Sequence, residues 1–191
     1  MVSQVDRHKY WAKEYDKVRR SKKVSIVGSG FVGVELAAEL LTRNAFNKVH
    51  VELRDFKETI LPGQPQECID YAMNFLESTG RCTFKLGDAC KNSQPDGDIA
   101  YQCVGLKPRL EFLDARYKDK KGFAQCNSQM QVCEEVEGGS LNPWNEGRVF
   151  AVGDCAEVQG TPLTKAIFYG EETASIASNN LLASCAPINR N

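Results

Sequence analysis

Three glycines in the spacing Gly28-x-Gly30-x-x-Gly33 constrain the fold of this chain more than any other feature. They follow a short β-branched run at 24–27, and they open a segment whose apolar residues recur at helical spacing. In that context the first glycine permits a tight turn, the second lets a ligand approach the backbone, and the third lets helix and strand pack closely. The pattern predicts a dinucleotide-binding βαβ unit over residues 24–55. The predicted pyrophosphate loop consists of Gly28, Ser29, Gly30, Phe31, Val32 and Gly33.

Asp55 follows a predicted strand at 48–53, in which hydrophobic residues face inward and His50 and Glu52 face outward. It lies about 20 residues beyond the glycines, the distance at which an acidic residue meets the adenosine ribose. A carboxylate there accepts a hydrogen bond from a free 2′-hydroxyl and repels a 2′-phosphate, so we expect NAD(H) rather than NADP(H). The neighbouring Arg54 and Lys57 oppose that preference. The alternative is that the glycines form an ordinary turn and Asp55 is a surface residue.

Two acidic residues, Glu35 and Glu39, lie four positions apart on the helix that follows the glycines. One face of that helix must pack on the sheet, and a carboxylate close to a buried surface either pairs with a base or has a function. Glu35 is therefore a candidate catalytic residue that would assist proton movement beside the nicotinamide or a flavin. The alternative is that it pairs with a base and holds the helix in place.

The rest of the chain predicts further strands and helices in alternation. Helices are expected at 5–20 and 66–79, strands at 81–86, 99–104 and 148–152, and loops at 92–98 and 138–143. Thr161 and Pro162 suit the N-cap and the first position of a final helix. Alternating strands and helices imply an α/β fold with a Rossmann-type parallel sheet that is covered on both faces.

The first 23 residues are basic, with eight Lys or Arg residues against three acidic ones. Trp11, Tyr15 and Val18 form an apolar stripe at helical spacing. We expect this stripe to pack on the domain. The alternative is peripheral membrane contact, with the helix lying on a membrane surface.

Composition argues against several classes of function. The net charge of −1 gives no reason to expect nucleic acid as a partner. No apolar run is long enough to span a bilayer and the N-terminus is too polar for a signal peptide, so we expect an intracellular protein, cytoplasmic or organellar. The eight cysteines include no C-x-x-C pair, so we expect reduced thiols, several of them buried, and no metal site.

Three ordered motifs resemble those of one enzyme superfamily. They are the segment 28–39, which contains the three glycines, the segment 98–108, which contains Gly105, and the segment 149–156, which contains Gly153 and Asp154. In this order they resemble the pyridine nucleotide-disulfide oxidoreductase superfamily. The likeness is greater to type II NADH dehydrogenases and to apoptosis-inducing-factor-like quinone reductases, and it covers most of the chain.

The resemblance implies NAD(H) and FAD as cofactors and a quinone or another small electron acceptor as the substrate. After a basic helical lead-in at 1–22, residues 23–105 would form the NAD(H)-binding domain, and residues 106–191 the C-terminal part of a split FAD-binding domain. Val104 and Gly105 match the point at which the chain leaves the nicotinamide domain. Gly153 and Asp154 match the segment whose aspartate contacts the flavin ribityl chain; without the resemblance they are a plain turn at a strand end.

The chain also departs from the superfamily. We expect it to lack the N-terminal unit that holds the FAD adenosine, and the segment 81–98 is shorter than the family's usual β-excursion. The first hypothesis is a piece of an FAD-dependent NADH oxidoreductase, and the second is a non-catalytic NAD(H)-binding module. The third is a fragment of a two-cofactor enzyme whose flavin domain a partner chain or a second copy completes.

Overall fold

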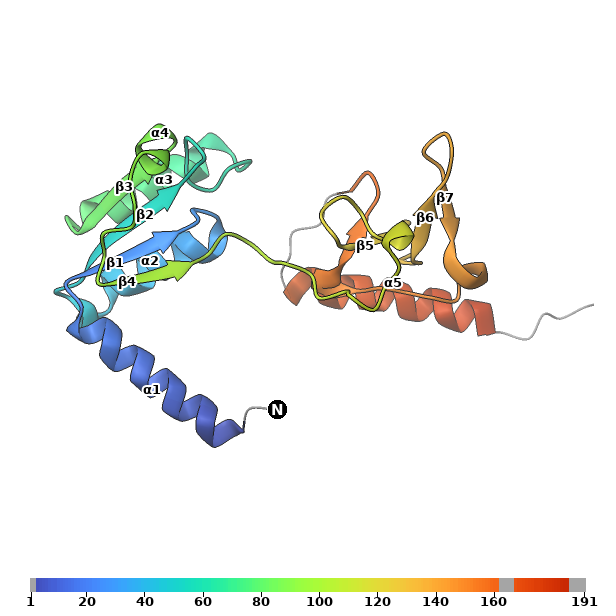
Figure 1. Ribbon diagram of the computed structural model, residues 1–191, viewed down its shortest axis with the longest axis horizontal. Coiled ribbons are helices and arrows are strands. Elements are labelled where there is room, and N and C mark those ends of the chain that lie inside the picture. Colours follow the sequence, from blue (N-terminus) through green and yellow to red (C-terminus); the bar gives the residue numbers. More distant parts are fainter. Residues whose placement is uncertain (1–2, 162–166, 186–191) are drawn as a thin grey trace, which may run out of the picture. The chain divides into compact units, whose positions relative to one another are not determined.

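The computed structural model describes residues 3–161 and 167–185, and the chain divides into two compact units, 1–105 and 106–191 (Figure 1). Each unit has its own hydrophobic core. The first unit is a parallel sheet with helices packed on it, and the second consists of short strands and one long helix.

A four-stranded parallel sheet forms the centre of the first unit. Its strands are β1 (Lys23–Val27), β2 (His50–Asp55), β3 (Cys82–Leu86) and β4 (Ile99–Gln102), in the order β3-β2-β1-β4. The central strand β1 pairs Val24 in register with Val51 of β2 and with Ile99 of β4. The predicted α/β fold with a Rossmann-type parallel sheet is confirmed.

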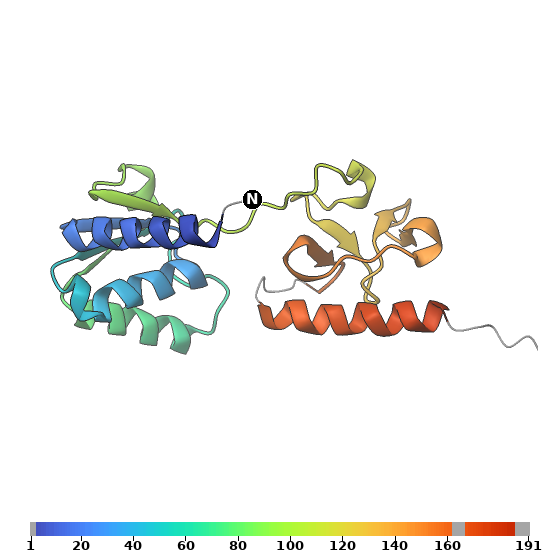
Figure 2. The same cartoon turned by 90° about the horizontal axis from the view of Figure 1, so that it is seen from below.

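Helices cover one face of this sheet. They are α2 (Phe31–Thr42) and α3 (Gln66–Ser78), which lie side by side (Figure 2), and the C-terminal end of α1 (Gln4–Arg20); the 3₁₀ turn η1 (Asn44–Phe46) follows α2. Alternate strand residues point to this face, so fully buried Ile26 and Leu53 belong to the same core as Leu76 of α3. This packing fixes the position of the loop between β1 and α2.

The opposite face of the sheet is polar, and this corrects the expectation of helices on both faces. Only the short helix α4 (Asp88–Lys91) and the loop at 92–98 lie over it among the described residues, in place of a crossover helix. The loop is tied down by polar contacts: Gly97 N–H donates to Ser25 Oγ (3.1 Å), and Arg54 donates to the carbonyl and hydroxyl oxygens of Ser93.

Glu52 lies at the centre of this polar face, which makes the outward orientation predicted for it wrong. Its side chain is fully buried and forms ion pairs with Arg54 (2.7 Å), Lys23 (3.2 Å) and Lys85 (3.2 Å). A carboxylate is tolerated at this depth because three cations surround it. β2 is therefore buried on both faces, as the inner strands of parallel sheets usually are.

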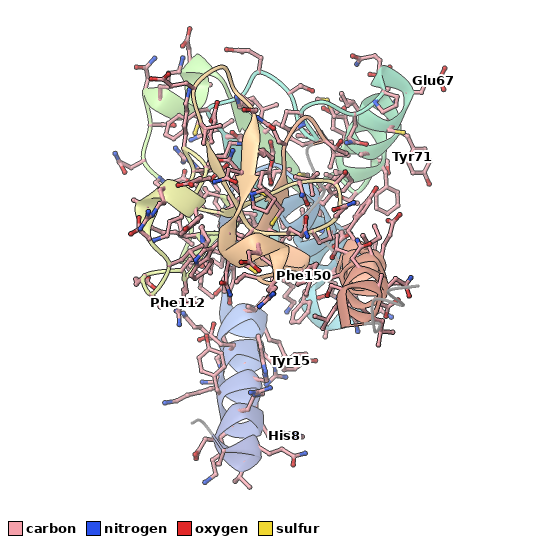
Figure 3. The ribbon with its side chains drawn as sticks, turned by 90° about the vertical axis from the view of Figure 1, so that its right-hand side faces the viewer. His8, Tyr15, Glu67, Tyr71, Phe112 and Phe150 are labelled. Carbon is pink, nitrogen blue, oxygen red and sulfur yellow. The ribbon has the colours of Figure 1, made fainter. Side chains whose placement is uncertain are left out.

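The apolar stripe of α1 is packed only at its C-terminal end. Val18 is buried, and the rings of Tyr15 and Phe46 lie 5.2 Å apart, but Trp11 is 62% exposed. The N-terminal half of the helix extends past the sheet of its own unit (Figures 1 and 3). The expectation that the whole stripe packs on the domain is therefore wrong for that half, and contact with a membrane surface stays a prediction.

Short strands beside one long helix make up the second unit. β5 (Ala124–Cys126) pairs in parallel with β8 (Ala156–Val158), and β6 (Cys133–Glu135) forms a hairpin with β7 (Leu141–Pro143). The 3₁₀ turn η2 (Ala115–Tyr117) precedes β5. Two more, η3 (Trp144–Gly147) and η4 (Gly153–Cys155), lie between β7 and β8, and α5 (Ile167–Cys185) follows β8. Met130, Val132 and Ala177 are among the buried residues of this core.

The strand predicted at 148–152 is not formed. Phe150, labelled in Figure 3, makes an isolated bridge with Gln131, and backbone hydrogen bonds join Val132 N–H to Val149 O (2.8 Å) and Ala151 N–H to Met130 O (3.1 Å). The segment is extended but turns into η4 before a ladder develops. The predicted start of the last helix at Thr161-Pro162 falls on 162–166, outside the described residues.

Two further expectations concern membranes and thiols. No helix in the described parts of the chain is both long and apolar enough to cross a membrane. The seven cysteines whose side chains are described are free thiols, and Cys90, Cys126 and Cys133 are buried.

Candidate functional site

The glycine-rich loop joins β1 to α2 at the carboxyl end of the parallel sheet. Gly28 has φ +109°, a conformation that other residues disfavour, and its N–H donates to Arg54 O (2.8 Å). A Cβ on Gly28 would overlap the carbonyl oxygen of Cys103, and a Cβ on Gly33 would overlap the carbonyl oxygen of Gly28. The packing of β1, β4 and α2 therefore requires the first and third glycines.

Gly30 differs from these two, because the fold itself does not require a glycine there. Its backbone angles (φ −71°, ψ −172°) suit any residue, and a Cβ would meet no atom within 4 Å. Gly30 is the N-cap of α2, and the first hydrogen bond within the helix runs from Val34 N–H to Gly30 O (3.0 Å). The amides ahead of Val34 have no acceptor in the helix and lie at the positive end of its dipole. This open helix end fits a pyrophosphate.

Exposed apolar side chains surround the loop. Phe31 and Val32, in the first turn of α2, are 48% and 65% exposed, and Val104 is 70% exposed. Val104 follows β4, whose end lies against Gly28, and Gly105 then turns the chain with φ +98°. The parallel topology thus brings these predicted site residues to one edge of the sheet, where open α/β sheets bind ligands.

Asp55 ends β2 beside the same loop. Its Oδ2 accepts the backbone N–H (2.7 Å) and the hydroxyl (2.9 Å) of Ser29, and its Oδ1 accepts the N–H of Lys57 (3.0 Å). Burial raises the pKa of Asp55, but these hydrogen bonds lower it by more, so the carboxyl pKa lies below its usual value. Asp55 is therefore a half-buried, ionised carboxylate at the position predicted to meet the ribose.

The two glutamates of α2 both lie on its solvent side. Glu39 pairs with Arg43 one turn further along, which is a structural role. Glu35 is exposed and has no hydrogen bond or ion pair with the residues that the structure describes. Its side chain is free to meet a ligand, and its catalytic role stays a prediction.

Gly153 and Asp154 form η4 in the second unit. Gly153 has φ +70°, and its N–H donates to Thr173 Oγ1 of α5 (3.0 Å), which fixes the turn on the long helix. Asp154 is exposed and forms no hydrogen bond or ion pair with the described residues. A free carboxylate on a fixed turn fits a hydroxyl-bearing ligand, such as the ribityl chain expected from the resemblance.

Sequence reasoning missed the roles of Ser29 and of the Glu52–Arg54 pair. The loop pattern fixed the position of Ser29 but said nothing of its hydroxyl. A signal for the pair does exist: Glu52 lies in a predicted strand of a parallel sheet and Arg54 directly follows that strand, and charges buried in such a sheet must be paired. Among the described residues there is no group of three or more His, Cys, Asp or Glu side chains suited to a metal ion.

The sheet order and the glycine loop after β1 place the chain among the α/β proteins with a Rossmann-type fold. The sequence profile of the pyridine nucleotide-disulphide oxidoreductase family matches residues 2–178, and the chain belongs to that family.

The individual proteins to which the chain is similar share about a quarter of its residues or fewer. The chain is 26% identical over 185 residues to oxidoreductase ptaL of Pestalotiopsis fici, which covers 88% of the chain and 45% of that protein. It is 26% identical over 168 residues to rubredoxin-NAD(+) reductase of Alcanivorax borkumensis, covering 77% and 40%. The water-forming NADH oxidase of Lactobacillus brevis, solved with NADH bound, shares the fold with a TM-score of 0.67 and 18% identity, covering 91% and 39%. The chain spans less than half the length of each of these proteins.

Proposed function

We propose that this chain acts in an NAD(P)H-dependent flavin oxidoreductase, in which hydride passes from NADH to FAD and electrons pass on to a quinone-like acceptor. The observation that carries the proposal is the open helix end at Gly30. Position 30 is a glycine although the fold has room for a side chain there, and this space lies at the N-terminal end of α2, where the first amides have no acceptor in the helix. Close approach of a pyrophosphate explains both facts.

The residues of the first unit bind and orient the nicotinamide cofactor. The first-turn amides of α2 hold the pyrophosphate, and Asp55 accepts a hydrogen bond from a ribose hydroxyl. Phe31, Val32 and Val104 are exposed apolar groups beside the loop, and they exclude water from the reacting end of the cofactor. Glu35, exposed on the same helix, holds or moves a proton there.

The second unit contributes to the flavin site. FAD, when bound, would supply the two-electron chemistry. Asp154 would accept a hydrogen bond from a hydroxyl of the flavin side chain, and the hydrogen bond from Gly153 N–H to Thr173 Oγ1 holds the turn that carries this carboxylate. The family membership of the chain supports both cofactors, and the rubredoxin and NADH reactions named for its relatives support electron transfer from NADH.

The test is the visible absorption spectrum of the purified chain, supplied with FAD and repeated after anaerobic addition of NADH. Flavin bands that bleach on addition of NADH are the expected result. A Gly30→Val variant should retain the flavin bands and lose the bleaching. A folded chain that binds neither FAD nor NADH would overturn the proposal.

A non-catalytic NAD(H)-binding module is the second candidate. It is supported by the fact that Gly28 to Gly33 and Asp55 all lie in the first unit, which has its own core. A chain that binds NADH but retains no FAD after incubation with it would favour this module over the oxidoreductase.

A further inference from the structure

We infer that Ser29 is a specificity-determining residue, which makes this site prefer NADH to NADPH by fixing the carboxylate of Asp55. The inference rests on the proposed NAD(H) site and adds the means by which that site rejects a 2′-phosphate. Ser29 lies between the first two glycines, so it belongs to the loop, and yet it contacts the residue predicted to meet the ribose.

Ser29 is held rigidly from two sides. Its side chain is fully buried, and its carbonyl oxygen accepts the N–H of Leu61 (2.8 Å). Its hydroxyl lies 2.9 Å from Asp55 Oδ2 and 3.4 Å from Thr59 O. Since a hydroxyl has one proton and the carboxylate is the nearer and charged acceptor, the proton goes to Asp55.

These contacts leave Asp55 little freedom. Oδ2 takes both donors of Ser29, and Oδ1 takes the N–H of Lys57 (3.0 Å). Rotating the carboxylate away would leave the amide of Ser29 without its acceptor and the buried hydroxyl with only the longer contact to Thr59 O (3.4 Å), which is unfavourable. The negative charge therefore stays where it is when a ligand arrives.

A fixed carboxylate separates the two cofactors. The 2′-hydroxyl of NADH is a donor, and Asp55 is an acceptor with a lone pair to spare on Oδ1. The 2′-phosphate of NADPH is an acceptor that carries about −1.5 to −2 charges at neutral pH. It would meet a charge of the same sign that cannot swing aside, so NADPH is rejected.

The neighbouring bases do not relieve this repulsion equally. Arg54 is 2% exposed, and its guanidinium is engaged by Glu52, the carbonyl of Cys90 and Ser93 on the polar face of the sheet. It is not available to a 2′-phosphate, although the sequence places it next to Asp55. Lys57 is exposed, so of the two bases that flank Asp55 it is the one whose side chain can still reach a 2′-phosphate.

The chain offers a matched control for Ser29. Ser25 is also a fully buried serine of the first unit whose hydroxyl donates to a carboxylate, Glu52 Oε1 (3.2 Å), but it lies under the loop at 92–98 and away from the glycine loop. Ser25→Ala removes a hydroxyl-to-carboxylate hydrogen bond of the same kind, together with the one from Gly97 N–H, at a residue outside the proposed site. Any general effect of losing a buried hydroxyl appears in both variants.

The experiment is the equilibrium binding of NADH and of NADPH to the full chain, with thermal unfolding measured alongside. We expect Ser29→Ala to lower the ratio of NADH to NADPH affinity about tenfold, the effect of one hydrogen bond to a charged group. We expect Ser25→Ala to lower the unfolding temperature and to leave the ratio unchanged.

The possible results are distinct. If Ser29→Ala unfolds earlier but keeps the wild-type ratio, Ser29 is merely structural and the inference is overturned, while the proposed NAD(H) site stands. If the folded wild type binds neither nucleotide, the proposed function fails and the inference with it. Should Ser29→Ala not fold, Ser29→Gly removes the same hydroxyl and must lower the ratio in the same way.

Discussion

The amide and the hydroxyl of Ser29 both donate to one oxygen of Asp55, at 2.7 and 2.9 Å. This pair joins the loop after β1 to the end of β2, so the groups predicted to meet the pyrophosphate and the ribose are parts of one hydrogen-bonded unit. A change at either residue is therefore expected to weaken the binding of both the pyrophosphate and the adenosine ribose. The usual description of a separate glycine loop and a separate acidic residue is too simple for this chain.

Asp55→Ala tests that coupling. The change removes the acceptor of three hydrogen bonds, so we expect unfolding free energy to fall by about 1–3 kcal/mol, because buried donors are left unpaired. NADH affinity should fall at least tenfold, because the hydrogen bond to the ribose is lost. NADPH affinity should fall less, because the variant also no longer repels the 2′-phosphate. Urea unfolding and nucleotide titration measure the two effects. Equal loss of affinity for both nucleotides would remove the role assigned to Asp55.

The lowered pKa of Asp55 predicts how its contribution depends on pH. Burial alone would raise this pKa, but the hydrogen bonds from Ser29 and Lys57 outweigh it. The unfolded chain therefore binds the proton at higher pH than the folded one, and the stabilisation is present above the ordinary carboxyl pKa of about 4 and lost as pH falls through the folded value. The stability difference between wild type and Asp55→Asn should be constant above about pH 5 and shrink in acid. A difference that vanishes near neutral pH would contradict this assignment.

Gly30 and Gly33 should respond differently to the same substitution. Gly30→Ala adds a Cβ in open space, so stability should change by less than about 0.5 kcal/mol while NADH affinity falls. Gly33→Ala forces a Cβ onto the carbonyl of Gly28, so the fold itself should lose stability by several kcal/mol. Thermal unfolding and NADH titration separate the two. Because Gly30 is also the N-cap of α2, only a Gly30→Ala variant that loses as much stability as Gly33→Ala would mean that the second glycine is there for packing.

The parts of the fold and of the site that could be predicted from the sequence are those determined by residues close together in the chain. The glycine spacing and the run at 24–27 predicted β1, the loop and α2, because turns and helix starts are fixed by neighbouring residues. Glu52 was misplaced, because alternation within one strand cannot show that Lys23, Lys85 and Arg54 converge from three strands to neutralise it. In the segment 148–152 the β-branched residues do favour extended backbone, but a strand also needs a partner, and that is a long-range property.

Glu52→Gln provides a stability prediction for the polar face of the sheet. The change leaves the buried guanidinium of Arg54 without its counter-ion, so we expect a loss of about 3 kcal/mol in unfolding free energy. The matched control is Glu39→Gln on α2, whose exposed pair with Arg43 is expected to contribute less than about 1 kcal/mol. Denaturant unfolding of both variants gives the comparison. Similar small losses in the two would show that the Glu52 network is not needed to hold the loop at 92–98.

Asp154→Ala tests the second unit. Asp154 is exposed and has no partner among the described residues, so its loss should leave unfolding free energy within about 0.5 kcal/mol of wild type. If its carboxylate holds the flavin side chain, FAD retention should fall, as measured by flavin fluorescence after gel filtration of the FAD-loaded chain. Asp119→Ala is the control, because Asp119 Oδ1 accepts the N–H groups of Lys121 and Phe123, and its loss should lower stability through the turn alone. Unchanged FAD retention in Asp154→Ala would mean that Gly153 and Asp154 are a plain turn, the reading that the residues support without the family resemblance.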